Sequence, residues 1–348
     1  MTYLNKYSFF TLSLFTFLSL LLFTDISNAA TKIDPIVFPD KPLKERLVHP
    51  DWFNLSFLDL PDDLAEANKK NKGLIIFYSQ GFCPYCKAFI KNNWEQKDII
   101  AYTRKNFDVI AIDVLGMQSL TGFDNKKYTE REYAIAQKTN FTPSLVFYDN
   151  QGKKALKFNG YRPPYQFRAA LEYVADSHHR KESFKTYLSR AESAMNFGND
   201  QLNTHDFFEK PPYDLTQKLE KHQQYSLVIY ERKKCHSCDV LHAGPLTSKN
   251  INTLLKNFKI IQLDMKSNTP VTTHLGYKFT ARSWADKLNL NYAPTLLFYD
   301  KKGKEIIRVD SVVGFFRLQG ILEYVTSKAY LKYPTFQQWR QRFSNITK

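Results

Sequence analysis

The sequence predicts two tandem α/β domains, each built from a central mixed sheet flanked by helices. The first observation is a repeated motif, because a Cys-x-x-Cys pair begins at Cys83 and again at Cys235. The second is a repeated tail: SLVFYD follows Pro143, TLLFYD follows Pro294, and each copy later contains LEYV. These landmarks keep almost the same spacing in both copies, and the repeat length, from Cys83 to Cys235, is longer than that of solenoid repeats. They therefore indicate a duplicated domain.

In each copy, short apolar runs alternate with segments of helical periodicity. The run GLIIFYS at 73–79 is typical of a buried strand, and Thr129 with Glu132 forms a capping-box pattern that begins a helix. The expected elements of the first copy are strand 73–79, a helix from Cys83 to about Asn106, strand 107–114, helix 130–139, a strand after Pro143, a turn at 149–152, a strand near 154–158 and a helix at about 164–177. The second copy repeats this order with YSLVIYE, the helix after Cys235, FKIIQLDM, helix 281–289, the strands LLFYD and EIIRV, and helix 315–327.

The repeat also sets the expected domain boundaries. These are a signal peptide at 1–29, a first domain with the CPYC motif at 40–177, a linker with a helical segment at 178–221, a second domain with the CHSC motif at 222–328, and a C-terminal tail helix at 329–348. In the tail, Phe336, Trp339 and Phe343 follow helical spacing, so we expect the tail to dock onto the second domain.

The first thirty residues predict an export signal. An uncharged stretch runs from Phe9 to Phe23, and the small residues Ser27 and Ala29 follow where signal peptidase reads the chain. The stretch is shorter than the roughly 20 residues of a membrane span, which favours a cleaved signal over an uncleaved membrane anchor. The expected location is therefore periplasmic or secreted, with the membrane anchor as the alternative.

The chain is strongly basic, with 49 Lys and Arg residues against 34 Asp and Glu residues and a net charge of +15. These charges fall in short scattered clusters, and export argues further against a nucleic-acid partner. A solvated basic surface is the simplest interpretation, and weak attraction to anionic lipids or acidic partners is the alternative. The sequence indicates no oligomeric state.

Each Cys-x-x-Cys pair lies between a predicted strand and a predicted helix. This arrangement places Cys83 and Cys235 at helix N-termini, where unpaired backbone N–H groups and the helix dipole favour a thiolate. The two intervening residues put Cys86 and Cys238 one turn away, where each can resolve a mixed disulfide. We therefore expect all four cysteines to be catalytic.

Other interpretations of the cysteines compete with this one. A structural disulfide usually closes a longer loop, and a zinc site made of two such pairs has ~15–20 residues between them, far fewer than separate Cys86 from Cys235. No metal and no cofactor is therefore expected. The alternative function is a binding or scaffold protein in which one pair, first of all Cys235 with Cys238, is a static disulfide.

The order strand, Cys-x-x-Cys, helix, strand, helix, X-Pro, hairpin and helix resembles the thioredoxin superfamily, here as two tandem thioredoxin-like domains. The first copy, which contains FYSQGFCPYCKAF and NGYRPPYQFRAALEYV, is more specifically similar to the SoxW-like secreted bacterial thioredoxins. The resemblance covers about 50–177 and, more weakly, about 222–328.

This resemblance implies a substrate-binding surface beside the thiols. In the thioredoxin fold the X-Pro bond that faces the cysteines is cis, and the backbone around it pairs with the substrate chain. Tyr85 is expected to shape an exposed rim around Cys83, and His236 is either a general base or a solvated histidine. The residues assigned to substrate binding are Thr142, Pro143, Ala293, Pro294, Pro84, Tyr85 and His236.

The expected function is that of an exported thiol–disulfide oxidoreductase, by resemblance a disulfide reductase. Cys83 attacks a substrate disulfide and Cys86 resolves the mixed disulfide, while Cys235 and Cys238 either repeat this reaction or relay electrons between the domains. The resemblance further implies protein disulfides and thiols of the envelope as partners, together with a membrane electron donor of the DsbD type.

Overall fold

The computed structural model describes residues 34–193, 200–216 and 225–344. The predicted signal peptide at 1–29 lies outside these ranges. Among the described residues, no helix is both long and apolar enough to cross a membrane. Residues from Pro35 onward form a single compact unit that contains both copies of the repeat.

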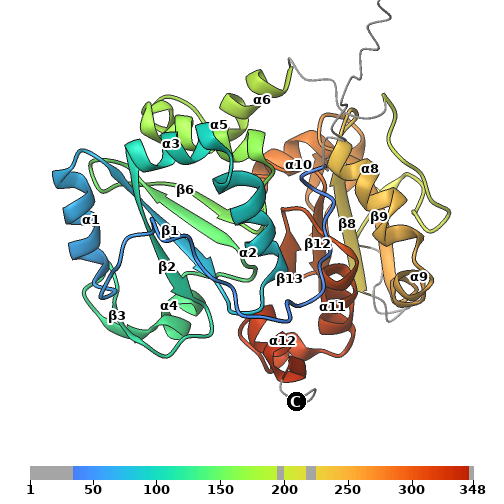
Figure 1. The fold of residues 1–348 in the computed structure, drawn as a ribbon. Coiled ribbons are helices and arrows are strands. Elements are labelled where there is room, and N and C mark those ends of the chain that lie inside the picture. The colour runs from blue at the N-terminus through green and yellow to red at the C-terminus, as the bar shows by residue number, and fades with distance from the viewer. Residues whose placement is uncertain (1–33, 194–199, 217–224, 345–348) are drawn as a thin grey trace, which may run out of the picture. The chain divides into compact units, whose positions relative to one another are not determined.

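The first copy folds around a four-stranded mixed sheet with the order β2-β1-β5-β6 (Figure 1). Strand β1 pairs in parallel with β2 and antiparallel with β5, and β5 pairs antiparallel with β6. The elements of this domain are α1 (Leu60–Lys69), β1 (Gly73–Ser79), α2 (Pro84–Phe89), α3 (Lys97–Asn106), β2 (Phe107–Asp113), β3 (Ser119–Thr121), β4 (Lys127–Thr129), α4 (Glu130–Ala136), β5 (Ser144–Tyr148), β6 (Lys154–Asn159) and α5 (Pro164–Ala175).

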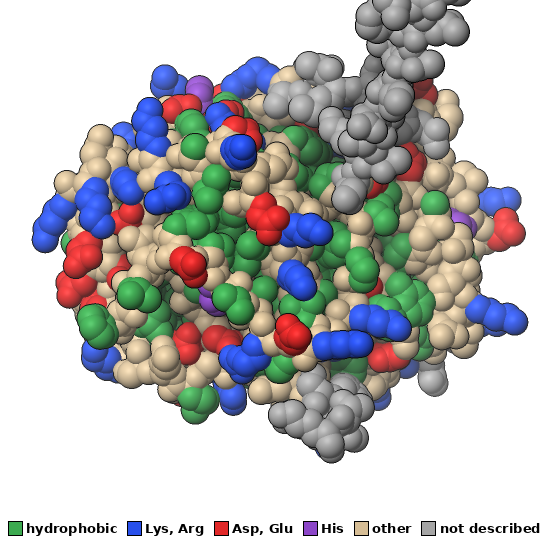
Figure 2. Space-filling view, viewed as in Figure 1, with side chains coloured by type: hydrophobic (Ala, Val, Ile, Leu, Met, Phe, Trp, Pro, Cys, Tyr) green, Lys and Arg blue, Asp and Glu red, His purple; other side chains and the backbone are tan. Residues whose placement is uncertain are grey.

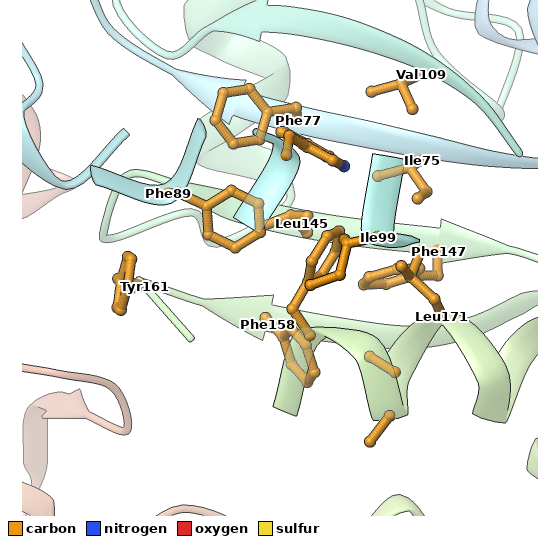
Figure 3. Packing of buried hydrophobic residues seen from close by; sticks show 14 of the residues in the cluster. Ile75, Phe77, Phe89, Ile99, Val109, Leu145, Phe147, Phe158, Tyr161 and Leu171 are labelled. Atoms are coloured by element: carbon orange, nitrogen blue, oxygen red, sulfur yellow. The ribbon is translucent and has the colours of Figure 1, made fainter. Parts of the chain in front are cut away.

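Alternate residues of β1 face two separate hydrophobic cores, as the period of two along a strand requires. Ile75 and Phe77 face the core under α2, α3 and α5, which Figure 3 shows from close by. Leu74 and Ile76 face the opposite core under α1 and α4. Helices therefore cover both sides of the sheet, which explains why GLIIFYS is apolar at successive positions instead of alternating.

Local details follow the sequence closely, with two additions. The capping box of α4 is present, with both the Thr129 side chain and the Glu132 side chain bonded to the backbone of the other residue. The long helix expected after Cys83 is divided by a π-helical turn at Ile90–Trp94 into α2 and α3. The connection between β2 and α4 forms a small hairpin from β3 and β4.

The second copy repeats this plan with the sheet order β13-β12-β8-β9 and the hairpin strands β10 and β11. Strand β8 is again parallel to β9 and antiparallel to β12. The elements are β8 (Tyr225–Glu231), α8 (His236–Ala243), α9 (Lys249–Leu255), β9 (Phe258–Asp264), β10 (Pro270–Thr272), β11 (Lys278–Thr280), α10 (Ala281–Lys287), β12 (Thr295–Tyr299), β13 (Glu305–Val309) and α11 (Phe315–Thr326).

The segment between the two domains packs on both of them. Helix α6 (Phe184–Ser193) packs on the first domain through Phe184 and Leu188. Strand β7 (Tyr213–Asp214), in the segment expected to be a linker, pairs with β10 of the second domain. Within the described ranges, short 3₁₀ turns add to these helices at His178–Arg180, Pro245–Thr247 and Ala329–Leu331.

The tail helix α12 (Phe336–Ser344) packs on the second domain through Phe336 and Trp339, as its spacing predicts. The side chain of Phe343, the third residue of that pattern, lies outside the described residues. Helix α12 also contacts the first domain, because Gln80 Nε2 donates to Gln337 Oε1 over 3.0 Å. The tail therefore joins both domains.

The two domains exchange aromatic side chains across their interface. Phe141, two residues before Pro143, is fully buried in the core of the second domain, with its ring 5.6 Å from that of Phe336. Tyr292, two residues before Pro294, is buried in the core of the first domain, with the Arg162 guanidinium 4.3 Å from its ring centre. Equivalent positions of the repeat thus anchor each domain in the other.

Candidate redox sites at the two cysteine pairs

The first cysteine pair lies where β1 meets α2. Cys83 is the N-cap residue of α2, and its Sγ accepts a hydrogen bond from the backbone N–H of Cys86 over 3.0 Å. Pro84 occupies the first turn of the helix, where its missing backbone N–H costs no intrahelical hydrogen bond. The two sulfurs form a disulfide with a Cα separation of 5.2 Å. The same N–H group is available to stabilise a Cys83 thiolate after reduction.

The residues before Pro143 lie beside this pair. The Thr142 Oγ1 atom is 3.2 Å from Cys83 Sγ, and the Thr142–Pro143 peptide bond is cis. The Thr142 carbonyl oxygen accepts a hydrogen bond from Arg317 Nη2 of the second domain over 2.8 Å. The structure thus brings the predicted residues Thr142 and Pro143 to the cysteines, and it places a side chain of the other domain against them.

Tyr85 does not form an exposed rim, so that part of the prediction is wrong. Its side chain is only 3% exposed because the second domain and the segment around Asp40 cover it. The Tyr85 hydroxyl donates to Asp40 Oδ2 over 2.9 Å and accepts from the Gly314 N–H over 2.7 Å. The Arg317 guanidinium stacks 3.2 Å from the ring centre. Burial raises the pKa of the Tyr85 phenol far above its usual value, so it stays protonated.

A pocket of about 260 Å³ opens beside Cys83. Cys83 lines it, whereas Cys86, which is fully buried, does not. Three arginines line the same pocket, namely Arg46, Arg317 and Arg340. Burial lowers the pKa values of the Arg317 and Arg340 guanidinium groups, although both groups remain cationic at neutral pH.

The second cysteine pair repeats the arrangement where β8 meets α8. Cys235 is the N-cap residue of α8, its Sγ accepts from the Cys238 N–H over 3.2 Å, and the two sulfurs form a disulfide. Cys235 Sγ lies 3.5 Å from the Ala293 carbonyl oxygen, and the Ala293–Pro294 bond is cis. The predicted residues Ala293 and Pro294 are therefore beside this pair as well.

Charged and polar groups around the second pair come from several segments. His236 begins α8 and is exposed. Lys234 pairs with Asp200 over 3.2 Å, and Asp239 accepts from the Asn203 side-chain amide over 2.8 Å. Next to the pair, the Tyr292 hydroxyl contacts Ser237 Oγ over 3.2 Å. Among the described residues, no group of three or more His, Cys, Asp and Glu side chains is arranged to hold a metal ion.

Sequence reasoning did not identify Arg317, Asp40 or Arg340 as part of the first site. One signal was available for Arg317: it precedes Gly320, Ile321 and Tyr324 at helical spacing, on the apolar face of α11. A cation on such a face requires a partner or a function. Asp40 and Arg340 carry no comparable signal, because their neighbours in space come from distant parts of the chain.

The basic surface is also clearer in the structure. On the face shown in Figure 2, Lys and Arg side chains are interspersed with Asp and Glu and form no continuous basic patch. The described residues also include ion pairs such as Lys72 with Asp108 and Lys185 with Asp286, in which a basic side chain is matched by an acidic one. A groove for nucleic acid requires basic residues gathered in one place. The face in view therefore offers no such groove.

The comparisons with known proteins agree with this architecture. The family model of the thioredoxin-like domain matches residues 60–175 and again 213–326, about two thirds of the chain. The chain therefore belongs to the thioredoxin-like family and contains two tandem thioredoxin-like domains. Among curated proteins, none matches the chain.

Solved structures with this fold align with part of the chain. A thioredoxin-fold protein from Helicobacter pylori is 22% identical, covers 40% of this chain and 98% of its own, and has a TM-score of 0.33. A disulphide isomerase from Xylella fastidiosa is 19% identical, with 39% and 88% coverage and a TM-score of 0.23. The C-terminal domain of DsbD from Neisseria meningitidis is 12% identical, with 31% and 88% coverage and a TM-score of 0.25.

Proposed function

We propose that this chain is an exported thiol–disulfide oxidoreductase that acts as a disulfide reductase. The observation that carries the proposal is the position of Cys83, which caps α2, accepts the Cys86 N–H and lines a pocket, while Cys86 lies behind it. This arrangement supports Cys83 as the attacking thiolate and Cys86 as the resolving thiol. The reducing direction, the export and a DsbD-type electron donor are proposed from the sequence resemblance to SoxW-like thioredoxins alone.

The second pair has the same local geometry, which supports a redox role for Cys235 and Cys238 too. Both cysteines of this pair are buried, as are those of the first pair, so burial does not distinguish the two pairs. The Tyr292 ring beside the second pair is, however, held by Arg162 of the first domain. This contact supports the alternative that this pair is a static disulfide in a domain that holds a partner. Electron relay between the two pairs remains part of the proposal.

An exchange assay with single-pair variants tests the function. We expect the variant Cys235→Ser/Cys238→Ser, which keeps the first pair, to exchange with glutathione or to reduce insulin in the presence of dithiothreitol. The variant Cys83→Ser/Cys86→Ser reports on the second pair alone, and a static disulfide there predicts no exchange. If neither pair exchanges with glutathione or with insulin, the enzymatic function is wrong and the binding function is favoured.

A further inference from the structure

The pocket beside Cys83 is enclosed by segments from outside the Cys-x-x-Cys loop. The segment 40–47, which precedes α1, lies along this loop, because the Leu43 N–H donates to the Phe82 carbonyl over 3.2 Å and the Leu47 N–H donates to the Gly81 carbonyl over 2.6 Å. Helices α11 and α12 supply further walls. Cys83 is only 1% exposed as a result. A small molecule fits a pocket of about 260 Å³, whereas a folded protein chain cannot approach the sulfur unless these segments move.

The walls of this pocket carry more effective positive than negative charge. Arg46, Arg317 and Arg340 line it, and so do the carboxylates Asp40 and Asp113. The Asp40 carboxylate already accepts the Tyr85 hydroxyl and the backbone N–H groups of 316 and 317. These hydrogen bonds occupy much of its capacity as an acceptor, although its charge still acts on Arg317 and Arg340. Asp113 lies 3.9 Å from Arg46 and accepts the Leu115 N–H.

Arg317 has unused binding capacity that points to an anion. The residue is 6% exposed, and its Nη2 donates to the Thr142 carbonyl, but its buried Nη1 has no hydrogen-bond partner among the described residues. Burial lowers the pKa of the Arg317 guanidinium, and the nearby Asp40 carboxylate offsets only part of this effect. A buried donor without an acceptor is costly. An anionic ligand in the pocket removes this cost, because it supplies the missing acceptor and further negative charge.

We propose that the first pair acts on low-molecular-weight disulfides whose flanking groups carry carboxylates, and that Arg317 and Arg340 bind such a carboxylate. This inference rests on the proposed reductase function and assigns small disulfides to the first pair, in place of the protein disulfides expected from the sequence. The Cys83 thiolate attacks one sulfur, a Cys83–sulfur bond forms, and the first substrate thiolate leaves and takes up a proton. The Cys86 thiolate then attacks Cys83 Sγ and releases the second thiol. Two electrons pass from the dithiol to the substrate.

A series of three disulfides of similar size and different charge tests the proposal. The probes are dithiodipropionate, which is anionic, hydroxyethyl disulfide, which is neutral, and cystamine, which is cationic. The prereduced Cys235→Ser/Cys238→Ser protein is mixed with each probe, and oxidation of the first pair is followed by alkylation and mass spectrometry. Relative to free dithiothreitol, we expect the anionic probe to react at least about tenfold faster than the neutral one, and cystamine to react slowest.

Arginine variants identify the source of this selectivity. In Arg340→Gln we expect the preference for dithiodipropionate to fall by about tenfold, with the rate of the neutral probe little changed. Arg342→Gln is the matched control, because Arg342 lies on the same helix, is exposed and does not line the pocket. Arg317→Gln is expected to remove the preference, and Arg46→Gln keeps the test decisive if the loss of buried Arg317 impairs folding.

Each outcome discriminates. Three results would overturn the proposed substrate class and leave the reductase function standing. In the first, all three probes react equally, at rates that match those with dithiothreitol. In the others, insulin is reduced faster than dithiodipropionate, or the preference for dithiodipropionate survives all three pocket variants. Failure of every probe and of insulin to react overturns both. A charge ranking that Arg340→Gln removes and Arg342→Gln preserves supports the carboxylate site.

Discussion

A Cys86→Ser variant is expected to accumulate a stable mixed disulfide at Cys83, and a Cys83→Ser variant is expected to lose first-pair exchange by more than about a thousandfold. The asymmetry follows from position, because Cys83 lines the pocket and Cys86 lies fully buried behind it. Removing the resolving thiol leaves the first attack intact, whereas removing the attacking thiol leaves no accessible nucleophile. Both variants are made in the Cys235→Ser/Cys238→Ser background, and intact mass reports the adduct.

The control in this experiment is the comparison of the two single variants, because the opposite assignment of attacking and resolving thiol predicts the opposite result. If Cys83→Ser accumulates the adduct and Cys86→Ser does not, the order of attack derived from the structure is wrong. Adducts on both variants at equal rates would show that the segments around the pocket do not restrict access. The second pair offers the same test through Cys235→Ser and Cys238→Ser in the Cys83→Ser/Cys86→Ser background. There, a static disulfide predicts no adduct on either variant.

A Phe141→Ala variant is expected to lose about 3–5 kcal/mol of the free energy of unfolding, the range for large aromatic side chains in a core. Phe141 is fully buried, and its ring packs 5.6 Å from Phe336 and 5.2 Å from the Arg317 guanidinium. Because these partners belong to the second domain, the truncation also weakens the contact between the domains. We therefore expect the two domains of the Phe141→Ala variant to unfold in separate transitions. Urea unfolding followed by both fluorescence and circular dichroism measures the two effects.

Phe57→Ala is the matched control for this experiment. The Phe57 side chain is as exposed as in an extended chain, at 103%, so the same truncation is expected to change the free energy of unfolding by no more than about 0.5 kcal/mol. A loss below about 1 kcal/mol for Phe141→Ala would mean that the exchanged aromatic side chain does not hold the domains together. The exposed control separates this result from a general sensitivity of the chain to losing an aromatic residue.

The interior of each domain was predictable from the sequence because it depends on local pattern. Apolar runs such as GLIIFYS became β1, the capping-box residues Thr129 and Glu132 began α4, and the repeat predicted that the second copy would follow the same order. The π-helical turn at Ile90–Trp94 was not predictable, because its residues keep the helical spacing on which the prediction relied. Boundaries therefore shifted while the elements remained.

The interface between the domains was not predictable in the same way. An apolar residue such as Phe141 or Tyr292 matches a core position whether that core belongs to its own domain or to the other one. Tyr85 was expected to be exposed because the motif alone does not show that Asp40 and α11 cover it. The arginines of the pocket come from three distant segments, and only the folded chain brings them to Cys83.

The midpoint potentials of the two cysteine pairs test the central claim most directly. Each single-pair variant is equilibrated in redox buffers, alkylated and weighed by mass spectrometry. We predict that the first pair titrates reversibly as a two-electron couple between about −270 and −120 mV, the range from thioredoxin to DsbA, and that the second pair also titrates if it is redox-active. A first pair that stays oxidised in dithiothreitol until the protein unfolds would contradict the account, because both cysteines would then belong to a structural disulfide.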